Sequence, residues 1–301
     1  MDKLTRRRFL QYSGGLAAAT MIARAEMPLF AADATDTVRD RLWVWGHIEG
    51  SYDNAWGLPQ NSRMTPLQGA ASLGIPNIIM IRYSNKPEPP YDEYAAQFRN
   101  VKKLMWSFVG DSGRTSEAEQ EHVMALSQKM PNMTGLFMDD FFHGNAIAPP
   151  GKSEAAASIS VARLKEIRER IAQLDRKPDI GVVLYSHQLN PAIRRHLDLC
   201  DLVSFWSWTA NDLANLHENF AKYQEIVPGK RTLLGIYMWD FGQSKPLSMD
   251  LMRMQCETAL KWLKEGKIEG MIFLATTICD MKIEAVEYAR QWIAEHGDET
   301  L

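Results

Sequence analysis

Cysteine is scarce in this sequence, because the chain of 301 residues contains only Cys200, Cys256 and Cys279. So few cysteines exclude a disulfide-rich scaffold. Their spacing provides no Cys-x-x-Cys pair, so structural zinc is not expected either. We expect three buried thiols, although a disulfide between two of them stays open for an exported protein.

The sequence also lacks an excess of basic charge, phosphate-binding loops and long apolar runs. The formal net charge of −3 argues against a protein built to bind nucleic acid. Neither G-x-G-x-x-G nor G-x-x-x-x-G-K-[ST] occurs, which disfavours a nucleotide-binding fold. A mean hydropathy of −0.29 excludes a polytopic membrane protein. What the chain does contain is 46% hydrophobic and 24% charged residues, with 9 Trp and 16 Met, a composition typical of a globular domain.

The first 34 residues are predicted to be an export signal and not part of the fold. Arg6 and Arg7 are followed by Arg8, Phe9 and Leu10, then by a short apolar stretch and small residues up to Ala34. This order resembles the twin-arginine signal of bacteria. The apolar stretch is too short to span a bilayer, so no stable membrane anchor is expected. We therefore predict a signal peptide at 1–34, a mature chain at 35–301, passage through the twin-arginine export machinery, and a periplasmic or secreted location.

The mature chain alternates short apolar segments with amphipathic helical segments. This alternation predicts parallel β/α units, and eight such units in about 265 residues match the usual size of a (β/α)8 barrel. The predicted fold class is therefore α/β, a single (β/α)8 TIM barrel, with an open doubly wound sheet as the alternative. The expected strands are 42–48, 77–83, 103–109, 135–141, 180–187, 202–208, 232–239 and 271–278. The clearest expected helices are 116–130, 158–174, 211–226, 249–265 and 283–296.

Acidic side chains follow several of these strands, at the end where a barrel carries its active site. Asp139 and Asp140 come at the end of the fourth predicted strand, beside bulky aromatic residues. Because successive residues of a strand point to opposite faces, we expect only one of the two in the lumen, and Asp140 in line with Leu136 and Met138 is favoured. Apolar surroundings would raise the pKa of such a carboxyl and suit it to general acid catalysis.

One reaction that uses such an acid is cleavage of a glycosidic bond, which needs a second carboxylate. Asp240, directly after the seventh predicted strand, is the favoured partner, and Glu49, Asp111 and Asp280 are the other choices. Tryptophans gather in the same segments, and flat indole rings are suited to stacking on sugar rings. The residues expected to bind substrate are His47, Glu49, Arg82, Tyr185, His187, Trp206, Trp208, Trp239 and Asp280.

Other chemistries have weaker support in the sequence. A metal-dependent barrel hydrolase would usually carry His-x-His on its first strand, whereas this chain offers His47-x-Glu49 and no histidine on the sixth strand. We therefore expect no metal and no cofactor. The G-x-S-x-G elbow of serine hydrolases is also missing. A metal-dependent TIM-barrel hydrolase or isomerase and a non-catalytic carbohydrate-binding barrel remain as alternatives.

The segment Thr-Gly-Leu-Phe-Met-Asp-Asp-Phe-Phe at 134–142 resembles the fourth-strand signature of glycoside-hydrolase-like TIM barrels. The resemblance implies a glycosidase acting on a poly- or oligosaccharide by carboxylate acid/base or nucleophilic catalysis, with Asp139 or Asp140 as a catalytic acid. The chain departs from known patterns, because the chitinase run D-x-x-D-x-D-x-E, an Asn-Glu pair after the fourth strand and a Glu after the seventh are absent. The resemblance therefore names no sugar and no linkage.

Overall fold

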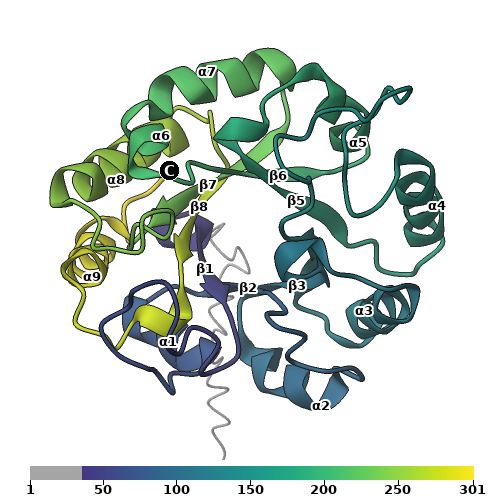
Figure 1. The fold of residues 1–301 in the computed structure, drawn as a ribbon. Coiled ribbons are helices and arrows are strands. Elements are labelled where there is room, and N and C mark those ends of the chain that lie inside the picture. Colours follow the sequence, from purple (N-terminus) through teal and green to yellow (C-terminus); the bar gives the residue numbers. More distant parts are fainter. Residues whose placement is uncertain (1–35) are drawn as a thin grey trace, which may run out of the picture. The chain divides into compact units, whose positions relative to one another are not determined.

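Eight parallel strands pair in chain order, and the last strand pairs with the first to close a barrel (Figure 1). This computed structural model describes residues 36–301, so the predicted signal peptide lies outside the described residues. The strands are β1 Leu42–Gly46, β2 Asn77–Met80, β3 Lys103–Val109, β4 Met133–Met138, β5 Asp179–Tyr185, β6 Leu202–Trp206, β7 Arg231–Tyr237 and β8 Gly270–Leu274. The predicted (β/α)8 TIM barrel is confirmed.

Helices form a ring outside the strands (Figure 1). They are α1 Pro66–Leu73, α2 Asp92–Ala95, α3 Glu117–Lys129, α4 Val161–Ala172, α5 Arg194–Leu197, α6 Ala210–Ala214, α7 Leu216–Ile226, α8 Met249–Lys264 and α9 Glu284–His296. The side chains of Ser116, Ser160 and Ser248 cap α3, α4 and α8 by accepting a hydrogen bond from a backbone N–H of the first turn. In the part of the chain that is described, no helix has the length and apolarity needed to cross a bilayer.

The helix predicted over 211–226 is interrupted. Asn215 adopts a non-helical backbone with φ −101° and ψ 22°, which separates α6 from α7. The short helices α1, α2 and α5 were not among the predicted ones. Hydrophobic periodicity has too few turns to be recognised in helices of four to eight residues.

Most strands end earlier than the sequence pattern predicts. β1 ends at Gly46, β7 at Tyr237 and β8 at Leu274, although the apolar pattern continues for several residues in each case. The extra residues remain buried outside the ladder, as do Trp239 after β7 and Ile278 in a short 3-10 helix after β8. Burial therefore extends beyond the hydrogen-bonded ladder, and an apolar pattern alone does not show where the ladder stops.

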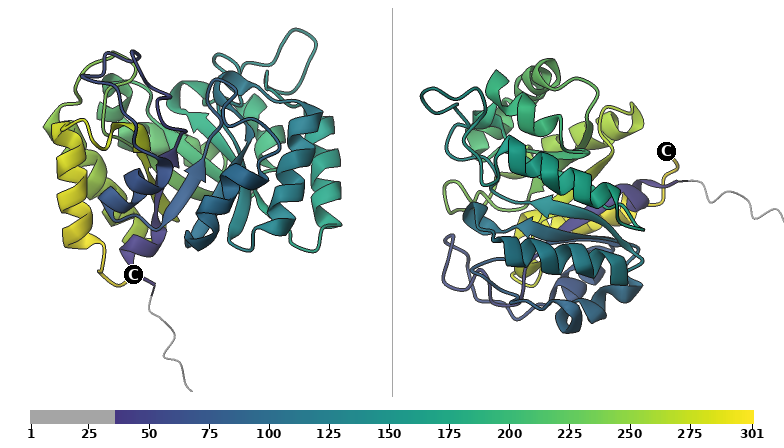
Figure 2. Two further views of the ribbon diagram at one scale, coloured as in Figure 1. Left: turned by 90° about the horizontal axis from the view of Figure 1, so that it is seen from below. Right: turned by 90° about the vertical axis from the view of Figure 1, so that its right-hand side faces the viewer.

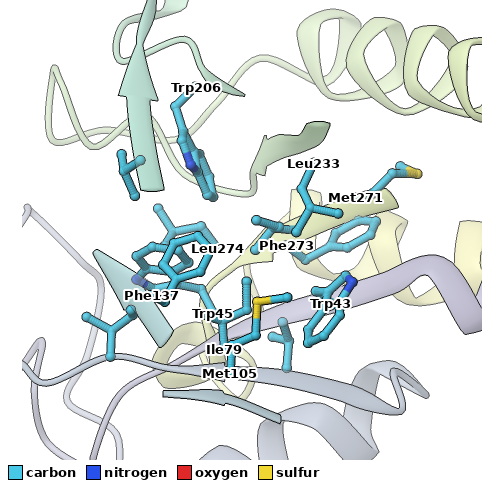
Figure 3. Packing of buried hydrophobic residues seen from close by; sticks show 14 of the residues in the cluster. Trp43, Trp45, Ile79, Met105, Phe137, Trp206, Leu233, Met271, Phe273 and Leu274 are labelled. Carbon is cyan, nitrogen blue, oxygen red and sulfur yellow. The ribbon is translucent and has the colours of Figure 1, made fainter. Parts of the chain in front are cut away.

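Large rings fill the middle of the barrel (Figure 3). Two of them, Trp45 and Trp206, also line the space above it. The Trp45 ring centroid lies 5.6 Å from that of Phe137 and 5.4 Å from that of Trp206, both in edge-on contact. Glycines make room for these rings: a Cβ at Gly235 would lie 2.0 Å from Trp206, and one at Gly181 would lie 2.6 Å from Phe137. The lumen is a packed core below and an open pocket above.

The two ends of the barrel differ. Long loops follow the strands at one end, and the C-terminus lies at the other (Figure 2). At that second end the backbone N–H of Leu301 donates to the carbonyl of Asp36, and the N–H of Val38 donates to the carbonyl of Glu299. The loop end therefore carries the residues that were predicted to form the site.

Candidate active site

A pocket opens at the carboxyl ends of the strands, directly above the ring-filled lumen. It holds about 560 Å³ of empty space, including the solvent at its mouth. Each of the eight strands, or the loop that follows it, contributes at least one lining residue. Most of the wall is aromatic: Trp45, Tyr52, Trp56, Tyr83, Tyr185, Trp206, Trp208, Tyr237 and Phe241.

The polar part of the wall is small and acidic. His47, Asp111, Asp139 and Asp140 line the pocket, and no lysine or arginine of residues 36–301 does so. This distribution makes the pocket suited to neutral ligands and to ligands that carry or develop positive charge. A negatively charged group would meet three carboxyls and no compensating cation.

Asp139 is the buried acid of the pocket. It follows Phe137 by two residues and so continues the row of β4 side chains that points into the lumen. Its side chain is only 6% exposed. Burial, together with the negative charges of Asp140 and Asp111, holds the pKa of Asp139 well above that of an ordinary carboxyl. Its Oδ1 accepts a hydrogen bond of 2.9 Å from the backbone N–H of Asp140.

Asp140 also reaches the pocket, although it is the next residue in the chain. Its backbone has φ 44°, in the left-handed region, so the strand alternation stops there. Its two carboxylate oxygens accept hydrogen bonds of 2.9 Å, Oδ1 from the Tyr185 hydroxyl and Oδ2 from the backbone N–H of Ser112. The expectation that only one of the two aspartates faces the lumen is wrong.

The expected orientation of β4 is also wrong. Phe137 contacts Trp45 inside the lumen, so Leu136 and Met138 point outward to the helix layer. The sequence could not decide this, because both faces of a barrel strand are apolar. With the register corrected, Asp139 is the acid that extends the lumenal row.

His47 and the pocket tyrosines form the neutral polar part of the wall. Burial lowers the pKa of His47 to about 4, so the ring is neutral at pH 7. Its Nδ1 lies 3.3 Å from the carbonyl of Ile81, to which it donates, so Nε2 accepts from the Tyr52 hydroxyl at 3.0 Å. Burial and the nearby carboxylates raise the pKa values of Tyr52, Tyr185 and Tyr237 well above 10, so these hydroxyls remain donors.

The structure brings part of the predicted set together. Six predicted residues line the pocket: Asp139, Asp140, His47, Tyr185, Trp206 and Trp208. His187 lies just outside, in an adjoining groove, where its ring stacks on Tyr185 with centroids 5.5 Å apart and an interplanar angle of 10°. The structure places these residues in or beside the pocket, and their roles in binding or catalysis remain predictions.

Asp240 and Arg82 lie outside the pocket lining. Asp240 is 3% exposed, its Oδ1 accepts from the backbone N–H of Gln243 at 3.0 Å, and its backbone pairs with Lys245. It therefore holds the turn after β7. Arg82 is buried against α3, where its guanidinium forms a two-point ion pair with Glu119. The lumenal row of β2 passes through Ile79 and Ile81, so Arg82 points the other way.

Three further predicted residues also lie outside the lining. Trp239 is 4% exposed and its indole N–H donates to the carbonyl of Trp56 at 2.8 Å, so it supports a wall residue from behind. Glu49 and Asp280 are exposed on the loops after β1 and β8. Neither carboxyl faces the pocket.

Several lining residues were missed by the sequence reasoning. Tyr83 and Tyr237 stand at the ends of predicted strands, and that position was the available signal for them. Tyr52 and Phe241 come from the loops after β1 and β7, where no periodicity indicates the direction of a side chain. Their rings lie 5.6 Å apart and close one side of the pocket.

Within residues 36–301, no three His, Cys, Asp or Glu side chains are grouped so that they could hold a metal ion. Cys200, Cys256 and Cys279 are buried free thiols. Burial raises the pKa of Cys200 and of Cys279 to about 12, so these two are unreactive at neutral pH.

No protein-family model and no curated protein matches this sequence. Among solved structures, the chain is similar to the glycoside hydrolase domain of PgaB (BpsB) from Bordetella bronchiseptica, at 11% identity and a TM-score of 0.51, with 83% of this chain and 98% of that chain covered. It is also similar to a probable 2-pyrone-4,6-dicarboxylic acid hydrolase from Acinetobacter baumannii, at 10% identity and a TM-score of 0.51, covering 84% and 91%. A family GH18 chitinase catalytic domain from the fern Peteris ryukyuensis matches at 13% identity and a TM-score of 0.47, covering 84% and 99%.

The two matches with a TM-score of 0.51 agree with the barrel fold. Glycoside hydrolases are among the TIM barrels that share it, and so is a probable hydrolase of a different kind of substrate. The fold alone therefore does not select the chemistry, which has to be argued from the pocket.

Proposed function

We propose that this protein is an exported glycoside hydrolase that cleaves glycosidic bonds in a poly- or oligosaccharide. One observation carries the proposal: a buried acid of raised pKa, Asp139, lies beside the hydrogen-bonded carboxylate of Asp140 in an aromatic-walled pocket. Two carboxyls in different environments are what acid-assisted glycoside cleavage requires.

In the proposed reaction Asp139 is the general acid. Burial raises its pKa and so favours the protonated form, which can give its proton to the glycosidic oxygen as the bond to the anomeric carbon breaks. The sugar in the pocket then develops the positive charge of an oxocarbenium-like transition state. Asp140, held by Tyr185 and Ser112, is the carboxylate that stabilises this charge and assists the attacking water, either as base or as nucleophile.

The sequence favoured Asp140 as the acid and Asp240 as its partner, whereas the proposal now makes Asp139 the acid and Asp140 its partner. The Asp240 carboxyl is used by the turn after β7, outside the pocket. Asp111 also lines the pocket, where its charge adds to the rise in the pKa of Asp139. The wall tryptophans, including Trp206 and Trp208, supply flat apolar faces for the sugar ring.

Substitution of each acid tests the proposal. Asp139→Asn and Asp140→Asn should each lower the turnover of a sensitive oligosaccharide by roughly 10²- to 10⁴-fold, the usual contribution of a positioned acid or base. Asp280→Asn is the matched control, because Asp280 is an exposed acid at the same end of the barrel. Reducing-sugar release and chromatography of products over a panel of glycans would measure the effect. Unchanged turnover in both pocket variants would reject the mechanism.

Measurements on the same protein also distinguish the two alternative functions. Full activity after exhaustive chelation is expected, whereas loss that zinc or another divalent metal restores would favour a metal-dependent hydrolase or isomerase. Binding of sugars without turnover of any glycan, unaffected by Asp139→Asn and Asp140→Asn, would favour a non-catalytic carbohydrate-binding barrel.

A further inference from the structure

The pocket has a second compartment beside it. An outer groove is lined by His143 and Gly144 from the loop after β4 and by His187 from the segment after β5. The groove and the pocket share four lining residues: Trp56, Asp140, Tyr185 and Trp208. The carboxylate of Asp140 therefore lies where the two compartments meet.

The pocket itself is closed at its inner end. Trp45, Trp206 and Leu274 close its floor, and side chains from all eight strand ends surround it. Trp56 and Trp208, whose ring centroids are 6.1 Å apart, stand at the junction with the groove. A polysaccharide lying across the barrel would need a channel that is open on two sides, and the walled pocket accommodates only the end of a chain.

We propose that the outer groove is a binding site for the leaving-group side of a glycan whose non-reducing terminal sugar occupies the pocket. The protein would then remove sugars one at a time from that end. This inference rests on the proposed glycosidase function.

Charge decides which side of the scissile bond enters the pocket. Positive charge develops on the sugar whose anomeric carbon is attacked, and not on the departing sugar. Asp111, Asp139 and Asp140 line the pocket without any lysine or arginine of the described chain, so the pocket is the better environment for that sugar. Aromatic faces also stabilise positive charge.

The groove has the chemistry of a neutral hydroxyl-binding surface. Apart from Asp140, its described lining contains no charged carboxylate, lysine or arginine. His143 and His187 offer ring nitrogens, and burial lowers the pKa of His187, so that ring is neutral at pH 7. A neutral imidazole can both donate to and accept from sugar hydroxyls.

With the terminal sugar in the pocket, hydrolysis breaks one glycosidic bond and consumes one water. The bond between the anomeric carbon and the glycosidic oxygen breaks, and the oxygen of the sugar in the groove takes the proton of Asp139. One water then adds its hydroxyl to the anomeric carbon, and its remaining proton returns to the carboxyl pair. The products are one free sugar in the pocket and a shortened glycan in the groove.

Product analysis is the first test. The probes are pentasaccharides of glucose, xylose, glucosamine and N-acetylglucosamine, each labelled at the reducing end. The expected first products are an unlabelled monosaccharide and a labelled tetrasaccharide. Labelled di- or trisaccharides as first products would overturn chain-end cleavage while leaving the glycosidase proposal intact.

Binding to the Asp139→Asn variant separates the two proposals. Quenching of tryptophan fluorescence should report binding of pentasaccharides with a free non-reducing end, and a bulky group on that end should abolish binding. End-dependent binding without turnover by the unsubstituted protein would support the groove and pocket assignment but reject the glycosidase. Equal binding of blocked and free probes, or no binding of any probe, would overturn the inference.

Substitution of a groove residue tests the groove directly. His187→Ala should lower kcat/KM for the pentasaccharide by roughly five- to tenfold, the effect of one net hydrogen bond. The loss on an aryl glycoside of one sugar should be clearly smaller, because that substrate does not fill the groove. His122→Ala, an exposed histidine on α3, is the matched control. Equal losses on the two substrates would contradict a role of the groove in binding the leaving group.

Discussion

Asp139 and Asp140 are neighbours in the chain but lie in very different surroundings. Asp139 has one backbone donor and is buried beside other carboxyls, which raises its pKa. Asp140 has a tyrosine hydroxyl and a second backbone N–H as donors to its carboxylate. Burial and hydrogen bonding thus divide the roles of acid and carboxylate between adjacent residues of the same type.

Asp139→Asn should stabilise the protein at neutral pH while lowering its activity. Because the folded-state pKa of Asp139 is raised, the folded chain holds a proton that the unfolded chain loses above about pH 4. Stability of the unsubstituted protein therefore falls as pH rises from about 4 to the folded pKa. The variant carries no such proton and avoids this loss, so its advantage over the unsubstituted protein should grow as pH rises through that range.

Urea unfolding at pH 4 and pH 7 would measure this difference. The variant and the unsubstituted protein should be almost equally stable at pH 4 and should diverge at pH 7, with the variant more stable. Asp280→Asn should show no such divergence, because Asp280 is exposed. A stability difference between the two proteins that is the same at pH 4 and at pH 7 would contradict the raised pKa of Asp139.

Tyr185→Phe should lower the proposed activity by about 10- to 100-fold, since a hydrogen bond to a charged group is worth about 1.5–3 kcal/mol. The change removes the hydroxyl that donates to Asp140 and retains the ring. Tyr94→Phe is the control, because the Tyr94 hydroxyl is buried without a hydrogen-bond partner, outside the pocket. Steady-state kinetics on an oligosaccharide would measure both, and equal rates for the two variants would argue against a catalytic role for Asp140.

At the scale of elements, the strands fit together by pairing large rings with glycines. Gly235 of β7 gives Trp206 of β6 its place, and Gly181 of β5 does the same for Phe137 of β4. These rings, with Trp45 of β1, close the lumen below the pocket (Figure 3). The glycine positions are therefore part of the construction of the site, although none of them lines it.

Gly235→Ala should destabilise the fold by about 1–3 kcal/mol, the usual cost of overfilling a packed core. The new Cβ would lie 2.0 Å from the Trp206 ring, which cannot remain in place. Thermal unfolding would measure the loss. Adding Trp206→Phe should recover part of the stability, since a smaller ring leaves space for the methyl group. Additive losses in the double variant would show that the two residues do not share this space.

At the scale of the whole molecule, closure of the barrel is what brings the site together. The lining comes from positions between Trp45 and Leu274, which are distant in the chain and converge because all eight strands end at the same rim. The opposite rim is closed by the pairing of Asp36 and Val38 with Leu301 and Glu299.

Export should depend on the paired arginines of the N-terminal segment. Replacing Arg6 and Arg7 together by lysine should leave the protein in the cytoplasm with residues 1–34 attached, because the receptor reads the arginine pair. Cell fractionation and intact mass would measure location and cleavage. Arg24→Lys, an arginine outside the motif, should be exported normally. Export of the double lysine variant at the normal level would reject the twin-arginine route.

The barrel could be predicted from the sequence because the patterns that indicate its strands and helices are local. Apolar segments such as 103–109 match their strands, and Ser116 begins a helix where the pattern predicts one. The position of acids and aromatics at strand ends was also visible in the chain. In a barrel that position is enough to place residues such as His47, Asp139 and Trp206 at one rim.

The direction in which those side chains point was decided only by the tertiary structure. Arg82 and Asp240 stand at strand ends like the pocket residues. Arg82, however, forms an ion pair with Glu119 of α3, and the Asp240 carboxyl accepts a hydrogen bond within the turn after β7. The left-handed backbone of Asp140 brings a second carboxyl into the pocket against the alternation of the strand. The sequence by itself determined the elements and the rim, since periodicity is a local property. Which acid is buried and which is held by donors depends on contacts between distant segments, and only the closed barrel specifies those.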